Sequence, residues 1–114
     1  MSNVYKIVAA PEWRAAEAAG VFTGAAVDLA DGYIHFSTAE QARETAAKHF
    51  TGQSDLLLVA VDAGRLGDAL KWEVSRGGAL FPHLYGPLSL DAVTRVTALP
   101  LDDHGAHDFA GLLE

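Results

Sequence analysis

The sequence contains no cysteine among its 114 residues. This absence excludes disulfide bonds, thiolate metal sites and cysteine nucleophiles, and it suits a reducing compartment. No apolar stretch approaches the roughly 20 residues that a membrane-spanning helix needs. The first residues lack the apolar segment of a secretion signal. We therefore expect a cytoplasmic protein that makes no contact with a membrane.

Basic residues are few, with 8 Lys and Arg against 15 Asp and Glu and a formal net charge of −7. No block of basic residues is present that could bind nucleic acid non-specifically, because such binding depends on many phosphate contacts. An anionic small ligand would instead need a local pocket built from Arg or His. Half of the residues are hydrophobic and a fifth are charged, a composition typical of one globular domain. The oligomeric state stays open.

Hydrophobic patterns and turn residues divide the chain into segments. A continuous apolar run at 56–61 indicates a central strand that is buried on both faces. The region 21–30 indicates an irregular loop or a short edge strand. The other predictions are a strand over 4–9, helices over 12–19 and 38–50, a kinked aromatic loop over 81–87, one helical turn over 88–92 and a last strand over 93–99.

The order of these segments is strand, helix, strand, helix and then mostly strands. This order indicates an α+β domain rather than a doubly wound one, which would keep inserting helices. We place the single domain at residues 1–101 and treat the acidic residues 102–114 as a C-terminal tail.

One strand of the second half alternates in polarity. Leu70, Trp72 and Val74 alternate with Lys71 and Glu73, which predicts a half-buried strand whose apolar side faces the core. Glu73 then lies on the solvent side, where an ordinary solvated carboxylate needs no function.

The stretch 31–38, with the sequence D-G-Y-I-H-F-S-T, predicts a turn, a short strand and the start of a helix. Strict alternation places Tyr33, His35 and Ser37 on one face of the strand. Ser37 with Glu40, or Thr38 with Gln41 one residue on, has the spacing of a capping box. Free N–H groups at this helix start suit an anion.

His35 and His83 are the two histidines in strong local contexts. Each is either a functional side chain that lines a cleft or an ordinary packed histidine bonded to the backbone. A metal site built on both histidines and Glu73 lacks any recognisable ligand spacing, so no metal is expected. Arg76 beside Gly77 and Gly78 is either an anion contact or a surface loop residue.

Four segments in combination carry a resemblance to a known family. They are Tyr5-Lys6-Ile7, the D-G-Y-I-H-F-S-T run from Asp31, Trp72-Glu73, and the F-P-H-L-Y-G run from Phe81. Together they resemble the bacterial domain-of-unknown-function family 952, which is similar in fold to the ADP-ribosyltransferase and RNA 2′-phosphotransferase group. The resemblance implies a split, curved mixed sheet and two main helices. It also implies that NAD, or an ADP-ribose-like portion of it, is bound as substrate in the cleft.

The resemblance also implies roles for individual residues. His35 matches a histidine that holds a ribose hydroxyl of NAD, and His83 stands near the place of the usual catalytic acid. With Glu73, the nearest carboxylate, they form the predicted catalytic set. The predicted ligand-binding residues are Tyr33, Ser37, Thr38, Arg76 and Tyr85. The histidine at position 83 is a departure, because a neutral imidazole supplies no negative charge to the ribose cation that forms when nicotinamide leaves.

Two functional hypotheses follow. The first is an enzyme of the NAD-dependent transferase or hydrolase type, and the alternative is a non-catalytic module that binds an ADP-ribose-like or other anionic nucleotide. Under a third reading, both histidines only pack. The observation that separates these readings is whether His35 and His83 converge on one open pocket.

Overall fold

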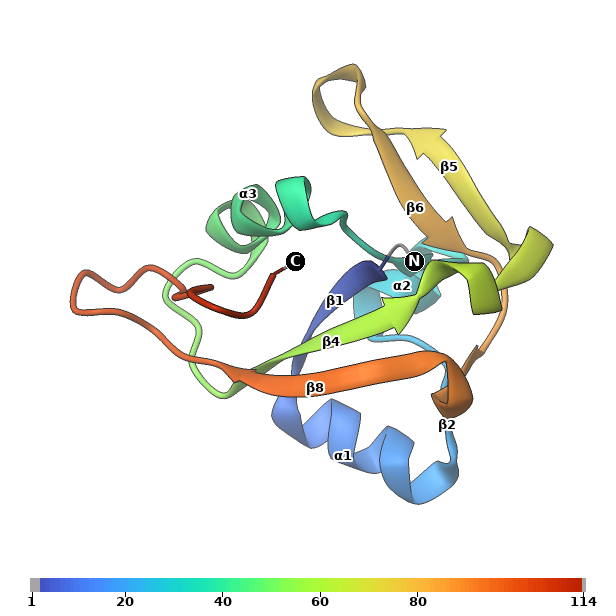
Figure 1. The fold of residues 1–114 in the computed structure, drawn as a ribbon, viewed down its shortest axis with the longest axis horizontal. Helices are drawn as coiled ribbons and strands as arrows, with labels where there is room; N and C mark the ends of the chain where they lie inside the picture. Colours follow the sequence, from blue (N-terminus) through green and yellow to red (C-terminus); the bar gives the residue numbers. More distant parts are fainter. Residues whose placement is uncertain (1–2, 114) are drawn as a thin grey trace.

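The chain forms three small antiparallel sheets accompanied by three α-helices (Figure 1), within residues 3–113 that the computed structural model describes. The side chain of Arg76 lies outside this description. The helices are α1 (Ala10–Ala19), α2 (Ala26–Asp31) and α3 (Ala39–His49). The strands are β1 (Asn3–Ala9), β2 (Val21–Phe22), β3 (Ile34–His35), β4 (Leu56–Asp62), β5 (Leu70–Val74), β6 (Leu80–Leu84), β7 (Leu88–Ser89) and β8 (Val93–Leu99).

Strand β4 is the centre of the largest sheet, whose order is β1-β4-β8. Every residue of β4 is buried, because helices cover both faces of this sheet (Figure 1). Alternate β4 residues enter two separate hydrophobic cores. Trp13 and Ala16 of α1 pack into one core, and Ala42 and Ala46 of α3 pack into the other. The prediction of a central strand buried on both faces is confirmed.

The second sheet has the order β3-β6-β5, and β2 pairs with β7 in a two-stranded ribbon. The chain just after β3 also joins the first sheet, because Tyr5 and Ser37 exchange backbone hydrogen bonds of 2.7 and 2.9 Å. The α+β class is confirmed. The prediction of a mixed sheet is wrong, since all strand pairs among the described residues are antiparallel.

At the start of α3, Thr38 rather than Ser37 is the N-cap. Thr38 Oγ1 accepts a hydrogen bond from the Gln41 amide at 3.3 Å, and Gln41 Oε1 accepts one from the Thr38 amide at 3.0 Å. Two backbone donors at the helix start are thereby satisfied. Ser37 is not the cap. Its hydroxyl lies 2.8 Å from the hydroxyl of Thr45 on α3.

Three sequence predictions about local structure are wrong. The region 21–30 contains a short strand, β2, in agreement with one of its two alternatives, but residues 26–31 form helix α2 instead of a loop or strand. Residues 80–84 form strand β6 although Pro82 lies within it. Strand β5 also differs from the prediction, because Leu70 packs against the first core but Trp72 and Val74 on the same side are 47% and 70% exposed. Alternation shows which residues share a face of a strand but not which face packs. The β5–β6 hairpin projects from the domain, so its outer face is left uncovered (Figure 1).

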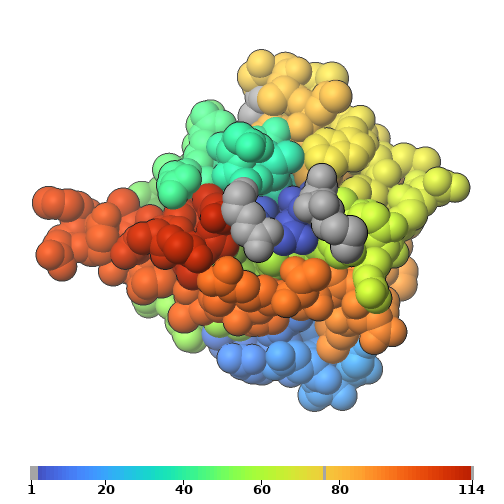
Figure 2. All heavy atoms as spheres, in the orientation of Figure 1, coloured from blue at the N-terminus to red at the C-terminus, as the bar shows by residue number. Residues whose placement is uncertain are grey.

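The C-terminal segment packs against α3 (Figure 2). Phe109 is 4% exposed within the second core, and the guanidinium carbon of Arg43 lies 5.6 Å from the centre of its ring. The division at residues 101 and 102 stays a prediction, but the burial of Phe109 is a reason to expect the tail to stabilise the domain. Among the described residues, no helix is both long enough and apolar enough to cross a membrane.

Phe109→Ala tests the contribution of the tail. Removing a buried phenyl ring should lower the free energy of unfolding by about 3–5 kcal/mol, because transfer and cavity terms add. Urea denaturation measures the loss, and Asp103→Ala, an exposed position of the same tail, is the matched control. A loss below about 1 kcal/mol for Phe109→Ala would instead support a domain that ends at residue 101.

Candidate functional site

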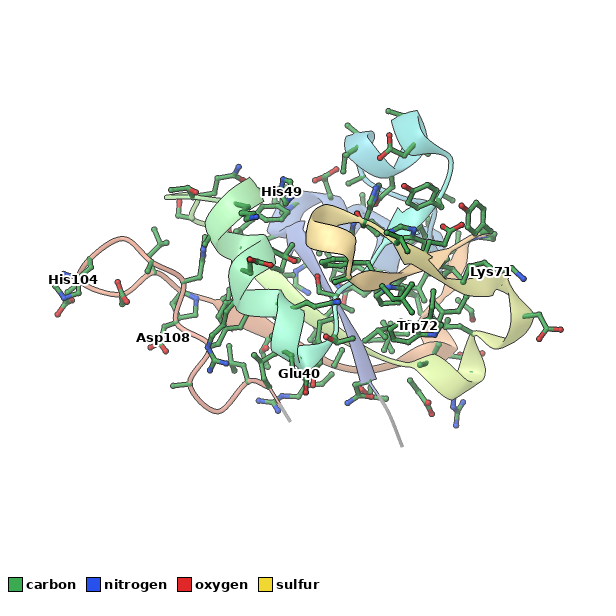
Figure 3. All side chains as sticks on the ribbon, turned by 90° about the horizontal axis from the view of Figure 1, so that it is seen from above. Glu40, His49, Lys71, Trp72, His104 and Asp108 are labelled. Carbon is green, nitrogen blue, oxygen red and sulfur yellow. The ribbon has the colours of Figure 1, made fainter. Side chains whose placement is uncertain are left out.

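A pocket of about 460 Å³ lies where the two larger sheets diverge. It receives side chains from β1, from α2, from the segment around β3, from β6 and from the second half of α3. His49 at the end of α3 belongs to its lining, whereas His104 lies at the distant tip of the C-terminal loop (Figure 3). The lining residues are Tyr5, Lys6, Ile7, Val27, Asp31, Tyr33, His35, Phe36, Ser37, Thr45, His49, Phe50, Ser75, Phe81 and His83.

The structure brings His35 and His83 together in this pocket. The two residues are direct partners in the β3–β6 pair, and their ring centroids lie 5.5 Å apart in an edge-on arrangement. His83 is only 4% exposed, whereas the His35 side chain is 30% exposed. Both histidines therefore line one open pocket, as the first two functional hypotheses require.

Tyr33 lies at the centre of the aromatic cluster formed with these histidines. Its ring stacks on His83 with centroids 4.2 Å apart, and it lies 4.6 Å from His35 and 5.2 Å from Tyr85. Burial, together with the charges of Asp31 and Glu73, raises the pKa of the Tyr33 phenol. The phenol keeps its proton at neutral pH and can donate a hydrogen bond, and one face of its ring is covered by His83.

Glu73 is bonded within the site and is not merely solvated. Its Oε1 accepts hydrogen bonds from Nδ1 of His83 at 2.7 Å and from the Tyr85 hydroxyl at 2.8 Å. These two bonds lower the pKa of Glu73, and the bond to Glu73 raises the pKa of Tyr85. An ionised carboxylate only accepts, so Nδ1 of His83 carries a proton. Nε2 of His83 makes no hydrogen bond to any described residue.

A buried carboxylate, Asp28 of α2, holds the other histidine. Asp28 is 2% exposed. Its Oδ1 accepts from Lys6 Nζ at 2.9 Å, from the His35 amide at 3.0 Å and from His35 Nδ1 at 2.6 Å. Its Oδ2 accepts from the amide of Ala25 at 2.8 Å. This single carboxylate thus ties β1 and α2 to β3.

The ionisation of Asp28 and Lys6 reflects a balance of burial and pairing. Burial alone would raise the pKa of Asp28, but the hydrogen bond from His35 and the charge of Lys6 together outweigh it and hold the pKa well below its usual range. Burial lowers the pKa of Lys6, and Asp28 opposes that shift. Asp28 is therefore a carboxylate at neutral pH.

Asp31, the last residue of α2, covers the second nitrogen of His35. Its Oδ2 lies 2.8 Å from His35 Nε2, and its side chain is 47% exposed. Both ring nitrogens of His35 thus contact a carboxylate, one buried and one at the surface of the pocket.

The remaining predicted site residues are placed less centrally. Ser37 lines the pocket, but its hydroxyl is bonded to Thr45. Thr38 does not line the pocket and acts as the helix cap. Tyr85 is 44% exposed at the edge of the cluster, and the Arg76 side chain lies outside the description. No group of three or more His, Asp or Glu among the described residues is arranged to hold a metal ion.

Sequence reasoning missed Lys6, Asp28, Asp31, Thr45 and His49. A lone lysine in an otherwise apolar strand was the available signal for Lys6, because such a lysine needs a buried partner. Asp28 was missed because helix α2, on which it lies, was not predicted. Thr45 and His49 carry no local signal, since only the packing of α3 brings them to the pocket.

The family model for Protein of unknown function (DUF952) matches residues 7–96 of the chain. The chain belongs to this family. A crystal structure of protein CC0527 from Caulobacter crescentus is similar, with a TM-score of 0.92, 57% identity and 96% of each chain covered. A solution NMR structure of the same protein gives a TM-score of 0.88 and 57% identity over 99% of this chain and 97% of that one. No curated protein matches the chain.

These comparisons confirm the predicted family. The likeness to ADP-ribosyltransferases and the cytoplasmic location stay predictions.

The lowered pKa of Asp28 predicts a specific sensitivity to acid. Because the folded-state pKa lies below the unfolded value of about 3.9, the stabilising contribution is fully present above that pH. It is lost as the pH falls toward the folded pKa. Urea denaturation over a pH series from about 7 to 2 measures this loss.

The variant for this test combines Asp28→Asn with Lys6→Met, so that no buried ammonium is left unpaired. Its stability should fall less steeply in acid than that of the parent. Asp31→Asn, which removes an exposed carboxylate from the same histidine, serves as the control and should retain the steep fall. Equal slopes for the double variant and the parent would show that Asp28 has no depressed pKa.

Proposed function

We propose that the pocket binds NAD, or the ADP-ribose portion of it, and that the protein acts on the ribose of this ligand. The observation that carries the proposal is the convergence of two histidines in one open pocket, each with Nδ1 bonded to a carboxylate. A histidine oriented by a carboxylate is a common arrangement for moving a proton or holding a hydroxyl. The pocket volume of about 460 Å³ is in the range of small-molecule sites.

In this proposal His83 and Glu73 act as one unit. Glu73 holds the proton on Nδ1, so Nε2 of His83 is a hydrogen-bond acceptor for a ribose hydroxyl. When the bond to nicotinamide breaks, positive charge develops on the ribose. The carboxylate of Glu73, 2.7 Å from the imidazole, supplies through His83 the negative charge that a neutral histidine alone lacks.

His35 and Tyr33 complete the ligand contacts of the proposed site. His35 binds a ribose hydroxyl through Nε2 once Asp31 has moved aside, and Tyr33 presents its hydroxyl and ring edge between the two histidines. Toward the end of α3, His49 offers a further group for a phosphate. These contacts suit a ligand with both ribose and phosphate.

A second candidate, a binding module without catalysis, is favoured by one specific observation. Both ring nitrogens of His35 are engaged by Asp28 and Asp31, so His35 is not poised as a proton acceptor. In this case the pocket retains an ADP-ribose-like ligand and leaves it unchanged.

Binding and turnover are measured separately to test the proposal. Isothermal calorimetry and thermal shift with NAD and ADP-ribose report binding, and a ligand at 100 times its Kd should add about 2.7 kcal/mol of stability. Release of nicotinamide from NAD reports turnover. His35→Ala should weaken binding at least about tenfold, as expected for the loss of a hydrogen bond in the site.

His83→Gln should retain binding and abolish nicotinamide release if the protein is an enzyme. His104→Ala, on the distant loop tip, is the control and should change neither quantity. Binding without any nicotinamide release in the parent protein would favour the binding module. No binding of NAD or ADP-ribose at millimolar concentration would contradict the proposal in both forms.

A further inference from the structure

We propose that Asp28 is a positioning residue for the pocket, which fixes the proton of His35 on Nδ1 and so presents Nε2 to the ligand. No part of the sequence resemblance assigns a role to Asp28. The assignment rests on four hydrogen bonds that converge on one buried carboxylate. Its consequence for ligand binding rests on the function proposed above, whereas the location of the proton does not.

Two of these hydrogen bonds fix His35 rather than the fold in general. Asp28 Oδ1 accepts from the backbone amide of His35 at 3.0 Å and from its Nδ1 at 2.6 Å. The first bond locates the main chain of His35 and the second locates its ring, so the imidazole has little freedom to turn. Because an ionised carboxylate only accepts, Nδ1 is the donor to Asp28, and Nε2 likewise donates to Asp31 while that contact is made.

Lys6 keeps the carboxylate charged in its buried place. The ammonium lies 2.9 Å from Asp28 Oδ1, and the side chains of Lys6 and Asp28 are 6% and 1% exposed. A buried charge without a partner would be costly. A purely structural ion pair needs only these two residues. Asp28 also makes hydrogen bonds to His35, whose side chain is 30% exposed in the pocket, so the buried pair holds a residue that a ligand can reach.

Asp31 contacts the other ring nitrogen of His35, and a ligand would have to displace it. Its exposed carboxylate contacts Nε2 of His35 at 2.8 Å, the atom that a ligand hydroxyl would use. Displacement of Asp31 exchanges one acceptor for another on Nε2 and leaves the buried bond at Nδ1 untouched. Asp28 and Asp31 thus have distinct roles, although both contact the same imidazole.

Long-range ¹H–¹⁵N NMR of the imidazole groups tests the assignment in the free protein, where it needs neither a ligand nor a variant. In the parent chain the His35 signals should show a proton on Nδ1. Asp31→Asn, the matched control, should retain that proton. A bare Nδ1 in the parent protein would overturn the proposal.

A variant provides the second test. Asp28→Leu combined with Lys6→Met leaves no buried charge unpaired, although the amides of Ala25 and His35 lose their acceptor. His35 should then lose its fixed Nδ1 proton, and affinity for ADP-ribose should fall at least about tenfold. An unchanged His35 spectrum in this variant would overturn the proposal. If the parent chain has the predicted proton but binds no ADP-ribose, the function proposed above fails and the role of Asp28 in fixing the proton stands.

Discussion

Residues 34–37 are hydrogen-bonded on both sides, and the remaining structure depends on this double pairing. On one side, Ile34 and His35 pair with β6, and the Phe36 amide donates to Pro82 at 3.0 Å. On the other side, Ser37 exchanges two backbone hydrogen bonds with Tyr5 of β1. One short segment therefore joins the two larger sheets. The sheets diverge from it, and the pocket occupies the space between them.

The position of residues 34–37 between the two sheets decides which of their side chains face the core and which face the pocket. Ile34 and Phe36 are 2% and 3% exposed and fill the first core, so the alternate residues Tyr33, His35 and Ser37 must line the pocket. Lys6 and Asp28 then fix His35 from the buried side, and Glu73 on the neighbouring strand β5 fixes His83. Rigid backbone pairing thus places two histidine–carboxylate pairs in one site, which is the preorganisation that binding and catalysis require.

Local patterns in the sequence predicted the parts of the fold that local physics determines. The buried run of β4, the stop of α1 at Gly20 and the alternation around His35 all depend on hydrophobic period or on glycine at positive φ. Helix α2 was missed because it has only six residues and begins after Ala25, whose side chain cannot cap a helix. It is instead stabilised by distant contacts of Asp28 with Lys6 and His35.

Only those residues of the candidate site that lie in a recognisable local sequence pattern were predicted. His35 was found through its strand and His83 through its aromatic context, and the structure brings both together. The polarity pattern of β5 indicated a solvated Glu73, and only the family resemblance placed Glu73 in the predicted catalytic set. Neither predicted its hydrogen bond to His83. Asp28, Thr45 and His49 come from elements whose approach is fixed by tertiary packing, which no local pattern encodes.

We propose that the space between the two larger sheets is a ligand site organised by His35 and His83. A crystal structure of the protein with ADP-ribose tests this claim most directly. We expect ligand density between the two imidazoles, with a ribose hydroxyl within hydrogen-bond distance of Nε2 of His83 and with Asp31 moved away from His35. Density elsewhere on the molecule, with the contact between Asp31 and His35 intact and the pocket filled only by water, would contradict it.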